Sequence, residues 1–418
     1  MKDDGLTRRR LLAAGGGGAI GLAIGGGAGF ALGHDDPPAD QPAESPGANV
    51  VPVWGPHQAG IADAPQDRLV FAAFDVTTDS QDVLADVLRQ WSDAIVKMTA
   101  GDPVGPVAGH PLAPPADTGE AMGLPAAGLT VTVGFGPSLF RAGRLGLEKR
   151  RPSLLHPLGP LPGEELLPAL SNGDLCVQAC ANDPQVAFHA IRNLARIGRG
   201  VVLLRWTQLG FGRAAATSPD QQTPRNLMGF KDGTNNIDAS DQAKMKRFVW
   251  VGDDEPQAWL RGGSYLVTRR IRMRIESWDR ANLDDQQVTI GRFKVNGAPL
   301  SGGQEHTPLR LSAKGPDGEP AIPDNAHVRL AAPEVNDDIE ILRRGYNYTD
   351  GTDPASGQLD AGLFFIAFQR DPAQFVALQN RLGASDALNE YILHTSSALF
   401  AVPPGFRRGG FVGEGLFA

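Results

Sequence analysis

The chain has 418 residues, of which 41 % are apolar, so it is long enough for two domains and apolar enough to build a full core. Its formal net charge of −8 argues against a nucleic acid as partner. A phosphate-binding surface needs a basic stripe, and the sequence shows none.

The first 50 residues have the composition of an export signal followed by a linker. Arg8 and Arg9 precede two leucines, and an apolar, glycine-rich run then reaches Leu32. A charged start, an apolar stretch and small residues at its end are typical of a signal peptide, and the doubled arginine resembles a twin-arginine signal. A retained transmembrane anchor is the alternative, because the run is near the lower length limit for spanning a bilayer. We therefore expect export by the twin-arginine route to an extracellular, cell-envelope or periplasmic location.

Residues 51–225 alternate short strands with helices. Residues 69–76 are apolar enough for a buried strand, and residues 80–98 repeat apolar side chains at helical spacing. The other elements expected here are a strand and a proline-started turn or helix at 127–140, a strand at 174–180 and a helix at 184–197.

A similar pattern returns after residue 225. Residues 361–375 again predict a strand followed by a proline-started turn or helix, and residues 264–273 predict another strand. Residues 278–288 are too polar for periodicity to decide between helix and loop, and residues 384–393 predict a C-terminal helix. Strand–helix–strand units in two similar halves favour an α+β fold with a domain boundary near residue 225.

The two cysteines, Cys176 and Cys180, lie on one predicted strand. Four residues apart on a strand, they share a face but are separated by about 13 Å, which is too far for a disulfide. A pair at this spacing is also weak evidence for a metal site. We therefore expect two buried thiols.

The most distinctive stretch is residues 229–237, in which Asp232 lies between two glycines and is followed by hydroxyl and amide side chains. Glycine lets the backbone approach a bulky planar or anionic group, although the pattern alone also describes a surface turn. A histidine string follows at residues 325–330 and an arginine string at 341–346. With residues 364–372, these strings resemble the dye-decolourising (Dyp-type) haem peroxidase family, in particular its twin-arginine-exported members of the deferrochelatase and peroxidase kind.

The resemblance runs over roughly residues 55 to 415 and implies two ferredoxin-like domains with antiparallel sheets. It divides the chain into the signal and linker at residues 1–50, an N-terminal domain at 51–225 and a haem-binding C-terminal domain at 226–418. It also implies one haem b per chain.

The resemblance implies roles for three residues of these strings. His327 matches the proximal ligand of the haem iron, because a neutral imidazole suits iron and leaves the opposite face open for peroxide. Asp232 matches the distal acid, which would move a proton from one peroxide oxygen to the other. Arg343 matches the distal arginine, whose charge would stabilise the departing oxygen. On a strand its neighbour Arg344 would point to the opposite face.

Two short segments are expected to line the haem. They are Gly233, Thr234 and Asn235 after the acid, and Ala332, Pro333 and Glu334 after the histidine. The second segment departs from an Asn-Pro-Arg form of the family, so the sequence lacks an arginine there that could pair with a propionate.

An exported haem peroxidase is therefore the leading hypothesis. Such an enzyme uses hydrogen peroxide to oxidise dyes, phenols or other reductants through high-valent iron–oxo intermediates. One alternative is a deferrochelatase that releases iron from haem, and another is a non-catalytic haem or iron-uptake binding protein, which would not need both Asp232 and Arg343. The sequence does not identify the physiological reductant, the oligomeric state or the partner of the second nitrogen of His327.

Overall fold

The computed structural model describes residues 49–217 and 221–418, so the predicted export signal lies outside the described residues. The described strands form one nine-stranded sheet in the order β5-β9-β2-β3-β1-β4-β7-β8-β6, and every pairing is antiparallel. Because β5 also pairs with β8, the sheet closes on itself. The strands are β1 (Arg68–Val76), β2 (Thr130–Phe135), β3 (Leu175–Ala181), β4 (Val202–Arg213), β5 (Ser264–Met273), β6 (Leu342–Arg343), β7 (Tyr346–Thr352), β8 (Leu359–Gln369) and β9 (Ile392–Val402).

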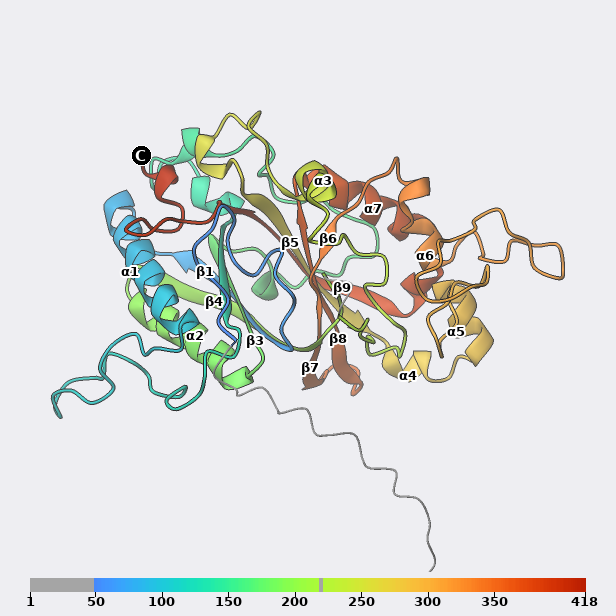
Figure 1. Cartoon of the computed structure of the whole chain (residues 1–418), viewed down its shortest axis with the longest axis horizontal. Coiled ribbons are helices and arrows are strands. Elements are labelled where there is room, and N and C mark those ends of the chain that lie inside the picture. Colours follow the sequence, from blue (N-terminus) through green and yellow to red (C-terminus); the bar gives the residue numbers. More distant parts are fainter. Residues whose placement is uncertain (1–48, 218–220) are drawn as a thin grey trace, which may run out of the picture. The chain divides into compact units, whose positions relative to one another are not determined.

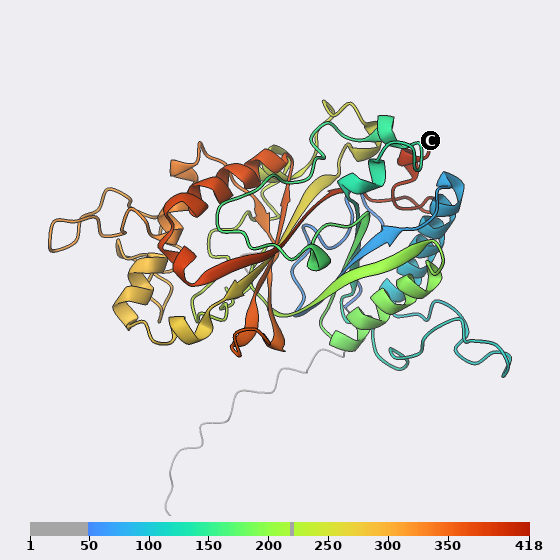
Figure 2. The ribbon, with the colours of Figure 1, turned by 180° about the vertical axis from the view of Figure 1, so that it is seen from behind.

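Helices lie at both ends of this sheet, with α1 and α2 at one end and α5, α6 and α7 at the other (Figures 1 and 2). The helices are α1 (Gln81–Thr99), α2 (Pro184–Ile197), α3 (Gln242–Lys244), α4 (Ile275–Trp278), α5 (Leu283–Ile290), α6 (His327–Leu330) and α7 (Pro372–Ser385). Single helical turns add Pro137–Phe140, Glu148–Arg150, Pro168–Leu170, Met245–Val249, Ala258–Leu260, Pro333–Val335, Ala387–Glu390 and Glu414–Leu416. Among the described residues, none of these helices has both the length and the apolar character needed to cross a bilayer.

The first half follows the order β1-α1-β2-β3-α2-β4, and its strands lie side by side as β2-β3-β1-β4. Helix α1 begins where the Ser80 side chain accepts a hydrogen bond from the Val83 amide, and it buries its apolar stripe on the sheet. Helix α2 begins after Asp183, which caps it, and ends before Gly198. Both helices confirm the sequence prediction to within a residue at each end, because their capping residues are local signals.

The second half repeats this order, with β5, then β7 and β8, then α7 and β9, and the strands lie side by side as β9-β5-β8-β7. The undecided residues 278–288 contain most of α5. The helix predicted for residues 384–393 is wrong. Helix α7 ends at Ser385, Asp386 then caps a single turn by accepting the Leu388 amide, and β9 begins at Ile392 because it pairs with β5.

Two large apolar clusters pack against the two faces of the sheet. One fills the space between the sheet and α1 and α2, around Phe74, Leu88 and Trp91. The other fills the interior of the closed sheet, where side chains such as Phe71 meet those of the opposite strands. Cys176 and Cys180 belong to this interior cluster as free, buried thiols, which confirms the prediction made for them.

Candidate active site

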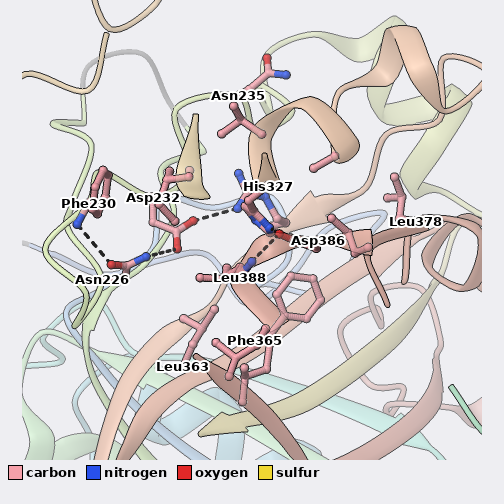
Figure 3. Close-up of a pocket in the computed structure, with 18 of the residues that line it drawn as sticks. Asn226, Phe230, Asp232, Asn235, His327, Leu363, Phe365, Leu378, Asp386 and Leu388 are labelled. Atoms are coloured by element: carbon pink, nitrogen blue, oxygen red, sulfur yellow. Dashed lines mark hydrogen bonds and ion pairs between the residues drawn. The ribbon is translucent and has the colours of Figure 1, made fainter. Parts of the chain in front are cut away.

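A large cavity lies in the second half, between the face of β5, β8 and β9 and the helices α6 and α7. It contains about 1620 Å³ free of protein atoms, part of which is open to solvent. Its walls are mostly apolar, with Leu363 and Phe365 from the sheet and Leu378 from α7, while Asp232 and His327 are among its polar groups (Figure 3). A large, mainly apolar cavity with a few convergent polar groups is the usual form of a cofactor site.

His327 is the first residue of the short helix α6, and Asp386 follows the last residue of α7. The Nδ1 atom of His327 lies 2.6 Å from Oδ2 of Asp386, whose other oxygen accepts the Leu388 amide at 2.9 Å. The Asp386 side chain is 2 % exposed, whereas the His327 side chain is 34 % exposed and lines the cavity. Because Asp386 occupies Nδ1, Nε2 is the ring nitrogen available to a metal.

The environment of His327 also changes its basicity. Burial lowers the pKa of His327, but the charge and the hydrogen bond of Asp386 outweigh that effect, and the pKa is raised above its ordinary value of 6.5. A carboxylate that stabilises positive charge on the ring also increases electron donation from the other ring nitrogen to a bound metal.

Asp232 and Arg343 meet at the cavity, although they lie far apart in the sequence. Nη1 of Arg343 donates to Oδ1 of Asp232 at 2.9 Å, and Nδ2 of Asn226 donates to Oδ2 at 3.2 Å. The Arg343 side chain is 27 % exposed and the Asp232 side chain is 16 % exposed, so both can reach a molecule in the cavity. An acid and a fixed cation in contact can move a proton and stabilise a developing negative charge.

The glycines on each side of Asp232 have a structural reason of their own. Gly229 and Gly233 have φ angles of 83° and 92°, which side chains other than glycine rarely adopt. A Cβ atom on Gly233 would lie 2.7 Å from the Cα of Ala215. The close approach that glycine permits is therefore, at Gly233, an approach of two backbone segments.

Arg344 points away from the cavity, as predicted for a strand neighbour of Arg343. Its side chain is fully buried, donates to the carbonyl of Asp63 and donates to Oε1 of Gln66 at 2.7 Å. It therefore ties the second half of the sheet to the segment before β1.

Five of the six residues expected to line a haem do line the cavity: Gly233, Thr234, Asn235, Ala332 and Pro333. Glu334 is not among the lining residues. It lies in the middle of the single turn Pro333–Val335. The structure thus brings together all of the predicted set except this glutamate.

Two residues that hold the site in place carry no signal in the sequence. Asp386 and Asn226 are the two that touch His327 and Asp232. No local pattern marks either one, because Asp386 lies 59 residues from its partner, and Asn226 looks like any turn residue six positions before the acid.

Fold and site together define a haem-binding oxidoreductase of α+β type, and comparisons with known proteins identify its family. The family model described as Dyp-type peroxidase, N-terminal, matches residues 58–212, and the C-terminal model matches residues 223–407. The chain therefore belongs to the Dyp-type peroxidase family, and it is a haem-dependent enzyme.

Individual relatives agree with this assignment. The chain is 38 % identical to a dye-decolorizing peroxidase of Thermobifida fusca, over 99 % of this chain and 97 % of that protein. It is 37 % identical to a deferrochelatase of Escherichia coli, over 85 % of this chain and 84 % of that protein. The structure of ferric DtpA from Streptomyces lividans is similar, with a TM-score of 0.82 and 40 % identity over 90 % of this chain and all of that chain.

Proposed function

We propose that His327, Asp232 and Arg343 make this chain a peroxidase that uses hydrogen peroxide to oxidise dyes, phenols or other reductants at one haem b per chain. The observation that carries the proposal is the arrangement of one cavity. A histidine with its Nδ1 held by a buried carboxylate and an acid–arginine pair both line it.

The residues of the cavity fit a haem. Asp386 keeps the proton on Nδ1 of His327, so the Nε2 lone pair can bind iron. Mostly apolar walls, with Leu363 and Phe365 on one side and Leu378 on another, suit a flat macrocycle. Gly233 to Asn235 would lie at its edge, where backbone and short polar groups can meet a propionate. Glu334 cannot supply the positive charge that an arginine would bring.

The side chains of Asp232 and Arg343 would activate the peroxide. Bound haem supplies an iron centre that peroxide oxidises by two electrons. Asp232 accepts the proton from one peroxide oxygen and returns it to the other, which makes that oxygen a good leaving group. Arg343 provides a fixed positive charge beside this carboxylate, which favours the anionic form of peroxide and stabilises the departing oxygen.

The test uses the purified chain loaded with haem b. We expect one haem per chain with a Soret band, a rapid change of that band on adding peroxide, and peroxide-dependent oxidation of a small phenol. A chain that binds no haem, or a haem-bound chain that leaves both peroxide and the phenol unchanged, would overturn the proposal.

A deferrochelatase activity is the second candidate, because relatives of that name are 37 to 39 % identical to this chain. Released iron and an intact, metal-free porphyrin distinguish this activity from peroxidation. Incubating the haem-bound chain with a ferrous chelator, with and without peroxide, measures both outcomes. The Asp232–Arg343 contact argues against a simple haem or iron carrier, since storage needs neither group.

The proposed location rests on the N-terminal sequence alone. The arginine pair and the apolar run after it support export by the twin-arginine machinery, after the chain has folded around its cofactor. Replacing Arg8 and Arg9 by lysine is expected to keep the protein inside the cell. Fractionation and immunoblotting measure the location of the variant. Unchanged export would refute this route.

The two halves of the chain are also proposed to be two ferredoxin-like units. With the two-residue β6 set aside, each half has one strand, a helical segment, two strands, a helix and a last strand. Each half then places its first strand between its third and fourth strands. This is the order of the split β-α-β motif. Their joining into one closed sheet explains why residues of the first half, such as Gln66, contact the second.

A further inference from the structure

Two asparagines flank Asp232 in the sequence, and each contacts one member of the acid–arginine pair. Asn226 donates to the Asp232 carboxylate, and Asn236 bonds the backbone of Arg343. We propose that Asn226 and Asn236 are positioning residues for peroxide activation, with Asn226 deciding which lone pairs of Asp232 face the cavity. This inference rests on the proposed function and adds residues to it.

The orientation of the Asn226 amide is settled by its neighbours. Its Oδ1 accepts the backbone amides of Met228 at 3.0 Å and Phe230 at 3.3 Å. Its Nδ2 must therefore face Oδ2 of Asp232, as Figure 3 shows. Turning the amide by 180° would break three hydrogen bonds at once.

This orientation limits where Asp232 can accept a proton. Arg343 donates to one carboxylate oxygen and Asn226 donates to the other, so the lone pairs that face them are already engaged. A proton taken from peroxide must therefore go to a lone pair that points elsewhere. Because Asp232 lines the cavity, the lone pairs left free for this transfer are those toward the cavity. Two donors, one on each oxygen, also prevent the carboxylate from rotating.

Asn226 is itself held in a tight turn. Its backbone amide donates to Phe230 O at 3.0 Å, and the Asp232 amide donates to Pro224 O at 2.9 Å. The Arg225 side chain fastens this turn by donating to the carbonyls of Gly229, Lys294 and Val295. The acid is thus held in place by the chain's own contacts.

Asn236 acts on the arginine through the backbone. Its Oδ1 accepts the Arg343 amide at 2.8 Å, and its Nδ2 donates to the Arg343 carbonyl at 2.8 Å and to Ala216 O at 3.0 Å. Arg343 lies on β6, which is two residues long and pairs with only β8 among the described strands. Asn236 therefore supplies the pair of hydrogen bonds that a neighbouring strand would give, and it holds Arg343 in reach of Asp232.

Asn226→Asp is the sharpest test. The new side chain keeps an oxygen for the two backbone amides, so the turn is retained, but it replaces the donor to Asp232 by a second carboxylate oxygen. We expect the rate at which peroxide changes the Soret band to fall at least tenfold, with haem content unchanged. Asn296→Asp is the matched control, because Asn296 is an exposed turn residue whose Oδ1 also accepts a backbone amide, that of Ala298.

A second readout needs no turnover. Fluoride binding to the ferric haem, titrated by absorbance at constant pH, should weaken at least tenfold in Asn226→Asp, because a second carboxylate is added beside Asp232. In an Asp232→Asn background the same change should slow the peroxide reaction by less than a further twofold, because its partner carboxylate is gone. A purely structural asparagine would leave the fluoride affinity and the peroxide rate at their wild-type values.

Asn236→Ala tests whether Asn236 positions Arg343. It should slow the peroxide reaction at least fivefold with haem retained, and it should add nothing in an Arg343→Leu background. Wild-type peroxide rates in Asn226→Asp and Asn236→Ala, while Asp232→Asn is slow, would overturn this inference and leave the proposed function intact. If the wild-type chain itself ignores peroxide, the proposed function fails, and the fluoride titration still decides the positioning role of Asn226.

Discussion

The two halves of the sheet share one strand arrangement once the two-residue β6 is set aside, and the second contains a large cavity between the sheet and its helices. In the first half, α1 and α2 pack directly on the sheet, and Trp91 fills their interface without any exposure. In the second half, residues 274–341 enter between β5 and β6 and carry α4, α5 and α6 (Figure 1). The same strand arrangement therefore supports a packed core in one half and a cavity in the other, and residues of the inserted segment line that cavity.

Each half also has a histidine–aspartate pair, and the two pairs differ in exposure. His189 lies 2.9 Å from Asp117, and the two side chains are only 6 % and 1 % exposed. His327 lies 2.6 Å from Asp386, but it keeps 34 % of its side chain exposed to the cavity. The first pair is almost fully enclosed, whereas His327 keeps part of its ring open to the large cavity.

The largest expected effect separates these two histidines. His327→Ala should reduce haem binding from one per chain to nearly none, because it removes the proposed iron ligand. His189→Ala should keep the full Soret absorbance and lower the melting temperature. Haem titration followed by absorbance measures the first effect and calorimetry the second. An unchanged Soret band and full turnover in His327→Ala would refute the ligand assignment.

Shortening a side chain packed between α1, α2 and the sheet should lower the free energy of unfolding more than shortening one that lines the cavity. Trp91→Ala should lower the free energy of unfolding by about 3 to 5 kcal/mol, because it leaves an enclosed void and a lost hydrogen bond to Leu194 O. The Leu378 side chain already borders the open cavity. Leu378→Ala should therefore lower the free energy of unfolding of the haem-free protein by less. Denaturant titration of both variants makes the comparison, and equal costs would contradict it.

Lowering the pH should reduce the stability of the folded chain through protonation of His394. Burial, with the charge of Arg269, lowers the pKa of His394 to about 4. The unfolded chain binds a proton near pH 6.5 that the folded chain refuses, so stability falls as the pH drops from 6.5 towards 4, by up to about 3 kcal/mol. His394→Gln should lose less stability between pH 7 and pH 4.5 than the wild type does. The exposed His156→Gln should behave as the wild type. Identical losses in all three proteins would exclude this role.

The acid–arginine pair should affect rate and leave haem binding unchanged. Arg343→Leu and Asp232→Asn should each slow the reaction with peroxide by about 100-fold, a loss typical of removing one charge-stabilising group. Stopped-flow absorbance of the Soret band is the measurement, and the exposed Arg141→Leu is the control. Wild-type rates in both variants would show that peroxide is activated by other groups.

The smallest effect concerns electron delivery to bulky substrates. Tyr391 is partly exposed and packs against Trp278 with ring centres 5.0 Å apart, beside residues that line the cavity. Tyr265, Tyr346 and Tyr348 are fully buried, and burial raises the pKa of each. Tyr391→Phe should slow the oxidation of a bulky dye a few-fold and leave a small phenol unaffected. Tyr265→Phe should change neither, and a dye rate unaffected by Tyr391→Phe would remove this residue from the path.

Elements with local signals were predicted well. The capping residues Ser80 and Asp183 mark the starts of α1 and α2, and the strand predicted for residues 264–273 is β5. The helix expected at residues 384–393 failed because its composition suits a helix, whereas pairing with β5 turns its last residues into a strand. Local propensity decides only where no tertiary contact competes with it.

For the site, the amino-acid sequence by itself determined the family and the three residues that carry the proposed chemistry, through short strings around Asp232, His327 and Arg343. It did not determine what holds them. Asp386 and Asn236 bond residues 59 and 107 positions away, and Asn226 bonds Asp232 across a turn of six residues. Hydrogen bonds of this kind leave no periodic pattern in the sequence. Only the tertiary structure brings these partners within 3.2 Å, because folding alone sets which distant groups meet.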